Sequence, residues 1–266
     1  MRRILVLSAL GLGLVAVVVY LGPLLLVHHK GALTTEQRLK ATNDARTSLA
    51  TVVSAIGLTG GLLFTAFTFR LSRTGQNTDR YQAAIAQLGD DRLTVRVGGI
   101  HALAKLAEDV PSVRQTVADV LASFIRDSGN AFRHVSSDVQ VAVTVLGRPA
   151  TDAALRPPDL SGAALPKAKL RRADLDGVDF TEAHLQGADL SDASLHRAAL
   201  RGARLYRANL SNTDLTDADL TDADLRNAIL YRADFSGATL TRCRLRGSDL
   251  TTIQNLSPGQ RRSARL

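Results

Sequence analysis

A repeat of five residues dominates the second half of the chain. Every fifth residue from Leu155 to Leu250 is Leu or Phe: eighteen Leu, with Phe at 180 and 235. The residue two places earlier in each unit is small, and from Ala163 to Ser248 it is Ala in fourteen of eighteen units. A period of five matches neither the 3.6 of an α-helix nor the 2 of a strand. It predicts a chain that turns a corner every five residues and buries one large and one small side chain on each side.

The repeated units carry a family resemblance. They include Ala-Asp-Leu-Ser-Asp at 188–192, Ala-Asn-Leu-Ser-Asn at 208–212 and Ala-Asp-Leu-Thr-Asp at 218–222. These units resemble the pentapeptide-repeat family, whose pattern is Ala-Asp/Asn-Leu-x-x. The resemblance implies a β-solenoid, a right-handed quadrilateral β-helix with four units per coil. Adjacent coils would lie roughly 4.8 Å apart, giving a rod on the order of 23 Å long over residues 155–252. The inward register would include Leu175, Phe180, Ala193, Leu195, Ala198, Leu215 and Phe235.

Two uncharged runs predict a transmembrane hairpin over residues 1–74. They cover about 4–27 and 49–69, and each is long enough to span a hydrocarbon core of ~30 Å as a helix. Basic residues number five on the side of the chain ends and four in the connecting loop, 28–48, so the positive-inside rule favours a cytoplasmic rod. Because Cys243 is the single cysteine, the chain cannot form an intramolecular disulfide, and this also favours the cytoplasmic side of a cell membrane. We read Cys243 as a small buried side chain rather than a reactive thiol.

Residues 75–154 show helical periodicity. Helices are expected from Thr78 to Gly89, over 95–107, from Ser112 onward and over 138–146. This small α-helical segment would act as a linker and as a cap on the open edge of the first coil. Residues 253–266 form a basic tail, and the C-terminal end of the rod is expected to be open, offering a route to a homodimer. The whole arrangement resembles the membrane-anchored pentapeptide-repeat proteins of high-GC, actinobacterial bacteria.

No pattern of catalytic, cofactor-binding or metal-ligating residues stands out. The Gly-rich stretch 57–61 falls inside an expected span, which argues against a phosphate-binding loop. The adjacent His28 and His29 sit next to an expected membrane surface, and the other histidines have no ligand-like spacing. A rod filled with Leu and Ala has no concave pocket of the kind that an enzyme needs. We therefore expect a protein that is not an enzyme and has no cofactor.

The net charge of the rod and of the chain helps to choose among the candidate non-catalytic functions. Residues 155–252 hold fourteen Lys/Arg and fourteen Asp/Glu, and the whole chain has a net charge of +8. The family resemblance implies one alternative, modulation of DNA gyrase by an acidic rod that mimics DNA, but mimicry needs a sustained negative field. A relay of signals across the membrane is a further alternative. The leading interpretation is a membrane-anchored scaffold that binds a partner protein, with nucleic acid an unlikely ligand.

Stacking the units at twenty residues per coil predicts a polarised rod. One side collects basic residues with Asp224 as the only opposing charge. The opposite side collects acidic residues with Arg156 and Arg197 as opposing charges; the acidic residues are Asp174, Asp176, Asp214, Asp217 and Asp234. We expect the basic side to dock an acidic partner protein or anionic lipid headgroups. Its residues are Lys167, Arg204, Tyr206, Arg207, Arg226, Arg244 and Arg246.

Overall fold

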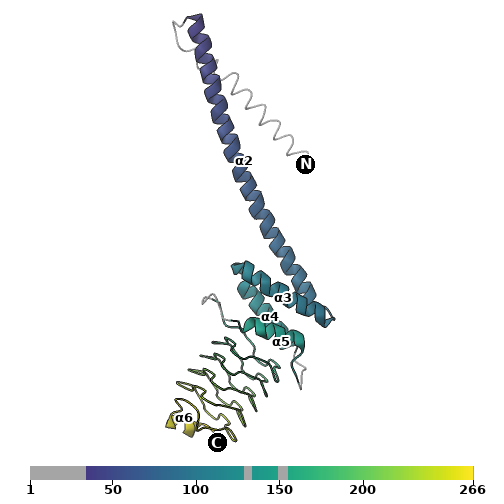
Figure 1. Cartoon of the computed structure of the whole chain (residues 1–266), viewed down its shortest axis with the longest axis vertical. Helices are drawn as coiled ribbons and strands as arrows, with labels where there is room; N and C mark the ends of the chain where they lie inside the picture. Colours follow the sequence, from purple (N-terminus) through teal and green to yellow (C-terminus); the bar gives the residue numbers. More distant parts are fainter. Residues whose placement is uncertain (1–33, 129–133, 149–154, 266) are drawn as a thin grey trace. The chain divides into compact units, whose positions relative to one another are not determined.

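The computed structural model describes residues 34–128, 134–148 and 155–265. The chain divides between Gln76 and Asn77 into two compact units, which we describe separately. Figure 1 shows the elements of both units: a long helix, several shorter helices and a stack of coils.

The first unit contains most of α2, a helix of 54 residues from Thr35 to Leu88. Its stretch Ala50–Thr68 has a mean hydropathy of 1.7 and none of its residues is buried, so it is long and apolar enough to cross a membrane. The other expected span, 4–27, lies outside the described residues. Within the described ranges this is the only such segment, so the two-helix hairpin is not supported. The expected loop over 28–48 is also wrong from Thr35 onward, where the chain is already helical.

Four helical segments form the beginning of the second unit. The end of α2 is followed by α3 (Leu93–Asp109), η1 (Pro111–Val113), α4 (Arg114–Asp127) and α5 (Ser137–Leu146). Their apolar faces meet in a core that includes Ile100, Leu121 and Val143, all fully buried. At Gly99 an added Cβ would lie 2.9 Å from the carbonyl oxygen of Ala84, so only glycine allows α2 and α3 to approach this closely.

Arg96 on α3 forms an ion pair with α5 and also bonds to the turn before α3. The Nε of Arg96 lies 2.6 Å from the Asp138 carboxylate, and its Nη1 donates to the carbonyl oxygens of Asp90 and Asp91. Burial by itself raises the pKa of Asp138, but hydrogen bonds from Ser136, Arg96 and the Val139 N–H outweigh it, so that the pKa lies below its ordinary value. The ionised carboxylate therefore has enough donors to remain charged in a nearly buried position.

The rod consists of coils that pair in parallel at intervals of twenty residues. The pairs run from Asp159 with Asp179 to Asp214 with Asp234, and each coil donates and accepts backbone hydrogen bonds with the next. At every corner the N–H of the small residue donates to the carbonyl of the preceding Leu or Phe, as Ala163 does to Leu160 at 3.1 Å. The third residue of each corner has φ near +60°, as a type II turn requires.

This left-handed position is glycine in only six of the eighteen corners between 162 and 247. Bulky residues such as Lys167 and Arg207 adopt the same φ, which is unfavourable for an isolated chain. Their N–H groups donate to the next coil, at 2.9 Å from Lys167 to Gln186 and 3.1 Å from Arg207 to Arg226. The ladder therefore holds these residues in a conformation that their own propensity would not favour.

The interior of the rod follows the five-residue register. All seven residues named for the inward register above are at most 2 % exposed. Thr213 replaces Ala at a small position, and its hydroxyl donates to the Leu190 carbonyl oxygen at 2.8 Å, which satisfies the one polar group there. Cys243 is free and buried, and burial raises the pKa of its thiol to about 12. The thiol is therefore protonated and inert at neutral pH.

The helices cover the edge of the first coil. The side chain of Gln140 on α5 donates to the carbonyl of Lys169 and accepts from its N–H, both at 2.9 Å. An amide side chain thus makes the same two bonds that a neighbouring strand would make. The guanidinium of Arg126 on α4 reaches the carbonyl and the carboxylate of Asp159, both at 2.6 Å. Open backbone edges of this kind invite further strand pairing unless they are covered.

The C-terminal tail closes the other end, and the expectation of an open end is wrong. Helix α6 (Pro258–Ser263) lies at the last coil, where the C-terminus is marked in Figure 1. The side-chain amide of Gln260 donates to the carbonyls of Phe235 and Ala238 at 2.7 and 2.8 Å. Beyond it, Arg265 pairs with the strand of Arg244. The free edge that suggested a homodimer through this end is therefore occupied.

Candidate interaction faces of the rod

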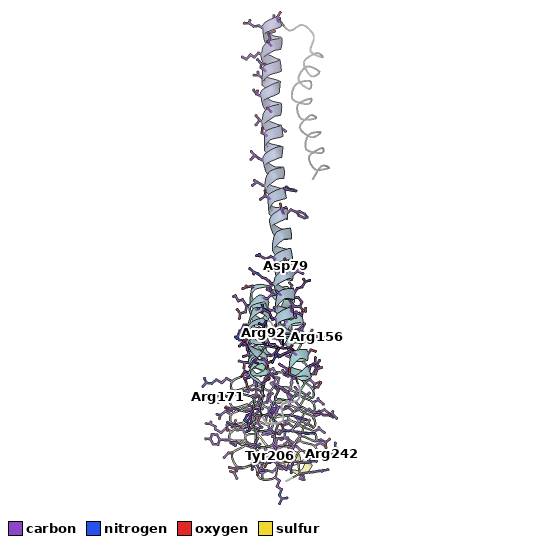
Figure 2. All side chains as sticks on the ribbon, turned by 90° about the vertical axis from the view of Figure 1, so that its right-hand side faces the viewer. Asp79, Arg92, Arg156, Arg171, Tyr206 and Arg242 are labelled. Atoms are coloured by element: carbon purple, nitrogen blue, oxygen red, sulfur yellow. The ribbon has the colours of Figure 1, made fainter. Side chains whose placement is uncertain are left out.

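Each coil has four outward sides, and one of them is basic. Its strand positions form a column in which His184, Arg204, Asp224, Arg244 and Arg265 pair in sequence. Figure 2 shows how densely side chains cover the outside of the rod, with Tyr206 of this side labelled. We call this side the basic face and define it by its charged and aromatic residues: Lys167, Arg204, Tyr206, Arg207, Asp224, Arg226, Arg244, Arg246 and Arg265.

Arg265 is the member of this face that the sequence did not reveal. It follows Arg244 by 21 residues rather than 20, because α6 intervenes, and its N–H donates to the Cys243 carbonyl at 2.7 Å. The twenty-residue count therefore misses it. Lys167 belongs to the same side, but Gly187 stands between it and Arg207, two coils and on the order of 10 Å further along. Lys167 is thus apart from the arginine cluster.

The centre of the basic face is organised around Tyr206. The guanidinium carbons of Arg207 and Arg226 lie 5.1 and 5.9 Å from the centre of its ring, within the range of cation–π attraction. Arg226 also makes two hydrogen bonds to the Asp224 carboxylate, at 2.8 and 2.7 Å. The hydrogen bond to Arg226 is the main reason that the pKa of Asp224 lies below its usual value. This aspartate is therefore ionised and neutralises only one of the arginines.

The remaining arginines of the basic face form no ion pair within the described part of the chain, although Asp224 acts on Arg244 and Asp222 on Arg265 through space. Among the described residues, no carboxylate lies within ion-pair distance of Arg204, Arg207, Arg244, Arg246 or Arg265, and all five are exposed. The pKa of the neighbouring His184 is lowered, first by burial and then by the charge of Arg204. A field that disfavours a protonated histidine would attract an anion.

The opposite side of the rod is acidic. We call it the acidic face; its carboxylates are Asp174, Asp176, Asp214, Asp217 and Asp234, and it also carries Arg197. The carboxylates of Asp214 and Asp234 each accept a backbone N–H with one oxygen, at 2.9 Å. Asp217 is more than half exposed, and its oxygen is 4.0 Å from Arg197. This side is therefore negative on balance at the level of Asp214 and Asp217.

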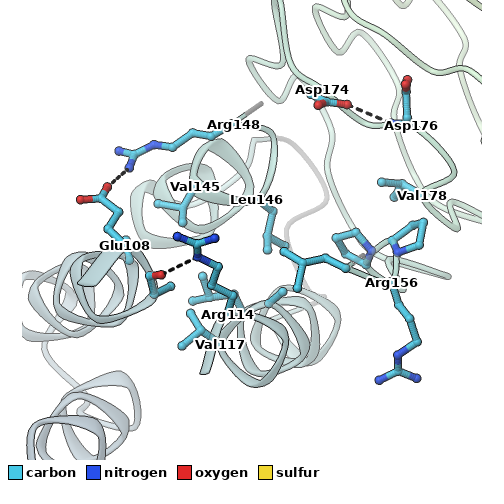
Figure 3. Close-up of a pocket in the computed structure, with 17 residues that line it drawn as sticks. Glu108, Arg114, Val117, Val145, Leu146, Arg148, Arg156, Asp174, Asp176 and Val178 are labelled. Carbon is cyan, nitrogen blue, oxygen red and sulfur yellow. Dashed lines mark hydrogen bonds and ion pairs between the residues drawn. The ribbon is translucent and has the colours of Figure 1, made fainter. Parts of the chain in front are cut away.

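A groove of about 780 Å³ lies where the helices meet the first coils, bounded by α3, α4, α5 and the Pro157–Pro158 corner. Figure 3 shows its charged groups, with Glu108 paired to Arg148 and the Arg114 Nε bonded to the Ala107 carbonyl at 2.9 Å. Asp174 and Asp176 stand on the far wall. In the part of the chain that the structure describes, no three His, Cys, Asp or Glu side chains are grouped to hold a metal ion. The groove brings together no nucleophile and base.

The twenty-residue coil and its five-residue corners define a β-helical repeat protein. A family model described as pentapeptide repeats matches residues 159–197, 179–217, 193–230 and 218–252. The chain belongs to the pentapeptide-repeat protein family.

Three solved structures of similar sequence come from cyanobacteria. The pentapeptide-repeat protein Rfr23 of Cyanothece 51142 is 35 % identical over 38 % of this chain and 67 % of its own, with a TM-score of 0.24. The pentapeptide-repeat protein alr5209 of Nostoc PCC 7120 is 34 % identical over 41 % and 84 %, with a TM-score of 0.23. HetL of Nostoc sp. strain PCC 7120, involved in the regulation of heterocyst differentiation, is 36 % identical over 37 % and 58 %, with a TM-score of 0.23. No curated protein matches the chain.

Proposed function

We propose that this protein is a non-catalytic scaffold that is attached to a membrane by α2 and presents its rod to protein partners. The observation that supports the proposal best is the basic face, where five exposed arginines form no ion pair with any described residue. The rod backbone is held by hydrogen bonds between every pair of coils, so a partner would meet these charges already in place. Preorganised groups of this kind lose little conformational entropy on binding.

Attachment through α2 is supported by the chemistry of its apolar stretch. Leu58, Leu62 and Phe64 are each about 70 % exposed, which is unfavourable in water. The threonine hydroxyls of the stretch form hydrogen bonds within the helix. Those of Thr59 and Thr65 donate to the backbone carbonyls four residues earlier, both at 2.8 Å. Such internal bonding is what a hydrocarbon environment demands. We place the rod on the cytoplasmic side, in keeping with a sole cysteine that is free and buried.

Extraction of membranes at alkaline pH tests this attachment. We expect the full chain to stay in the membrane pellet, because removing the exposed apolar stretch from lipid is unfavourable. Replacing Leu58 and Leu62 by Lys should shift the chain to the supernatant, since a lysine near the centre of a span costs roughly 3 kcal/mol. The matched control changes the same two residues to Ala, which should stay in the pellet. A wild-type chain that appears in the supernatant would contradict the proposal.

Partner binding is tested by reversing charge on the basic face. We expect the variant Arg226→Glu, Arg244→Glu, Arg246→Glu to lose the proteins that co-purify with the cross-linked wild-type chain, because the field that attracts them changes sign. The control variant Lys169→Glu, Arg172→Glu, Arg232→Glu makes the same change in net charge on a neighbouring side of the rod. It should retain them. Equal recovery with both variants would remove the basic face from the function.

The same purified chain separates this proposal from action on DNA gyrase. The rod balances fourteen basic against fourteen acidic residues and lacks the sustained negative field that a DNA mimic needs. It is therefore expected to leave gyrase supercoiling activity unchanged.

A further inference from the structure

We propose that the basic face of one copy docks on the acidic face of a second copy, so that rods pack side by side in open rows. The proposal names a partner for the docking surface described above, and it rests on the proposed function only in treating the rod as such a surface. Two surfaces of opposite charge lie on opposite sides of the same rod, ten residues apart in a coil of twenty. Each molecule therefore carries both halves of the contact.

The charges of the two faces match at the level of one central coil. In the coil that carries Arg204 and Arg207, the opposite side presents Asp214 and Asp217. In the next coil, Asp234 lies opposite Asp224, whose carboxylate is already bonded to Arg226. Two parallel rods have the same spacing between coils, so that aligning one pair of levels aligns the others. A partner with a different repeat length could not keep this register.

Of the two cations on the acidic face, Arg156 pairs with Asp119 on α4, and Arg197 meets a suitable surface. Arg197 lies one coil before Asp217, and at its level the basic face presents His184 and Gln186 instead of an arginine. Burial is the first cause of the lowered pKa of His184, and the charge of Arg204 is the second, which together favour the neutral ring. In parallel register no guanidinium is forced against another at this level. Avoiding like-charge contact is as important to specificity as making favourable pairs.

The geometry also determines the kind of assembly. Because the two faces are on opposite sides, a pair of rods leaves one basic face and one acidic face unoccupied. Such a contact is heterologous and continues into a row rather than closing as a two-fold dimer. Attachment of every copy to one membrane would raise their local concentration. Exposed ion pairs are individually weak and are screened by salt, so the contact depends on low ionic strength and on this concentration.

The test uses the full chain in a nonionic detergent, without other proteins or anionic lipid. Sedimentation velocity at low salt should show a distribution that grows with protein concentration, and at about 0.5 M salt, where the Debye length is only a few ångströms, it should collapse to single chains. The variant Arg204→Glu, Arg207→Glu should remain as single chains at low salt. The variant Asp214→Lys, Asp217→Lys should do the same.

Mixing the two variants provides the decisive measurement. Each supplies the face that the other has lost, so the mixture should recover the salt-sensitive association that neither shows alone. The substitutions use residue types that the rod already holds at equivalent corners and strands, Glu182 and Lys167 at the left-handed corner and Lys169 at the strand position. The control Lys169→Glu, Arg232→Glu changes the net charge as the first variant does and should associate like the wild type. Melting curves of all variants show that the rod is folded.

Three outcomes would overturn the proposal: a wild-type chain that stays single at low salt at all concentrations, variants that associate as it does, or a mixture that fails to recover association. A wild-type chain that stays single would indicate that the basic face binds an anionic lipid or another protein instead of a second copy. Because no other protein is present in the measurement, failure here leaves the capture of partners from membranes unaffected. Failure of that capture, with association intact, would instead restrict the rod to self-assembly.

Discussion

Replacement of Ala193 by Trp is expected to destabilise the rod more than any other single substitution discussed above. Ala193 is 2 % exposed and faces inward between Ala173 and Thr213 of the adjacent coils. No volume is available for an indole, and the ladder bonds on both sides prevent the backbone from moving apart. Overpacking of this kind costs about 3 kcal/mol or more, which corresponds to a fall in melting temperature of roughly 10 °C for a unit of this size.

The matched control is Ala199→Trp. Ala199 lies at an outward strand position in the same coil and pairs with Asp179 and Asp219 of its neighbours. Its partly exposed side chain leaves room for an indole on the surface, so we expect a change of less than about 0.5 kcal/mol. Thermal unfolding followed by circular dichroism measures both. Similar melting temperatures for the two variants would show that the inward register is wrong.

Removal of residues 257–266 is expected to have the second large effect. The deletion eliminates five hydrogen bonds to the last coil, two from the side chain of Gln260 and three through the backbones of Ser263 and Arg265. At about 1 kcal/mol each, the loss is on the order of 5 kcal/mol. The deletion also uncovers a strand edge, so we expect the truncated chain to melt earlier and to aggregate. Light scattering during thermal unfolding follows both effects.

A point substitution separates the contribution of the cap from the loss of ten residues. Gln260→Leu leaves the carbonyls of Phe235 and Ala238 without the donors they have now, and it removes the acceptor of the Ser257 N–H in the capping box of α6. We expect a loss of about 2 kcal/mol. Arg261→Leu changes the exposed neighbouring residue in the same helix and should be close to neutral. If the Gln260 variant and the truncated chain both have the melting temperature of the wild type, the tail does not cap the rod.

The rod was predictable from its sequence because its structure is local and repetitive. Each five-residue unit makes the same turn and buries the same two side chains, so Leu and Ala at fixed spacing specify both the corner and the side that faces inward. A period that persists for twenty units also determines which outward residues stack, which is why the arginines at 204, 207, 226, 244 and 246 could be assigned to one side. The helices of 93–146 were predictable for a similar reason, from their 3.6-residue periodicity.

The ends of the rod were not predictable in this way. Gln140 lies in a predictable helix and Gln260 in the basic tail, but in the sequence either could be an ordinary surface residue. Their role exists only because the fold brings an amide side chain to an unpaired coil edge more than twenty residues away along the chain. The same is true of Arg265, which joins the basic face through a return of the chain after α6. The tail looked like a free basic segment because the bonds that attach it to the rod are made with residues distant in sequence.

The coils were predictable and the ends of the rod were not, for a single physical reason. Within the coils, the five-residue period specifies the turn, the inward register and the polarity of the two faces, since each contact repeats between equivalent positions. Closure of the two ends and the uninterrupted length of α2 depend on contacts or continuity that no repeat encodes. Unpaired backbone groups on the terminal coils must be satisfied, and tertiary structure alone decided that α5 and the tail would satisfy them.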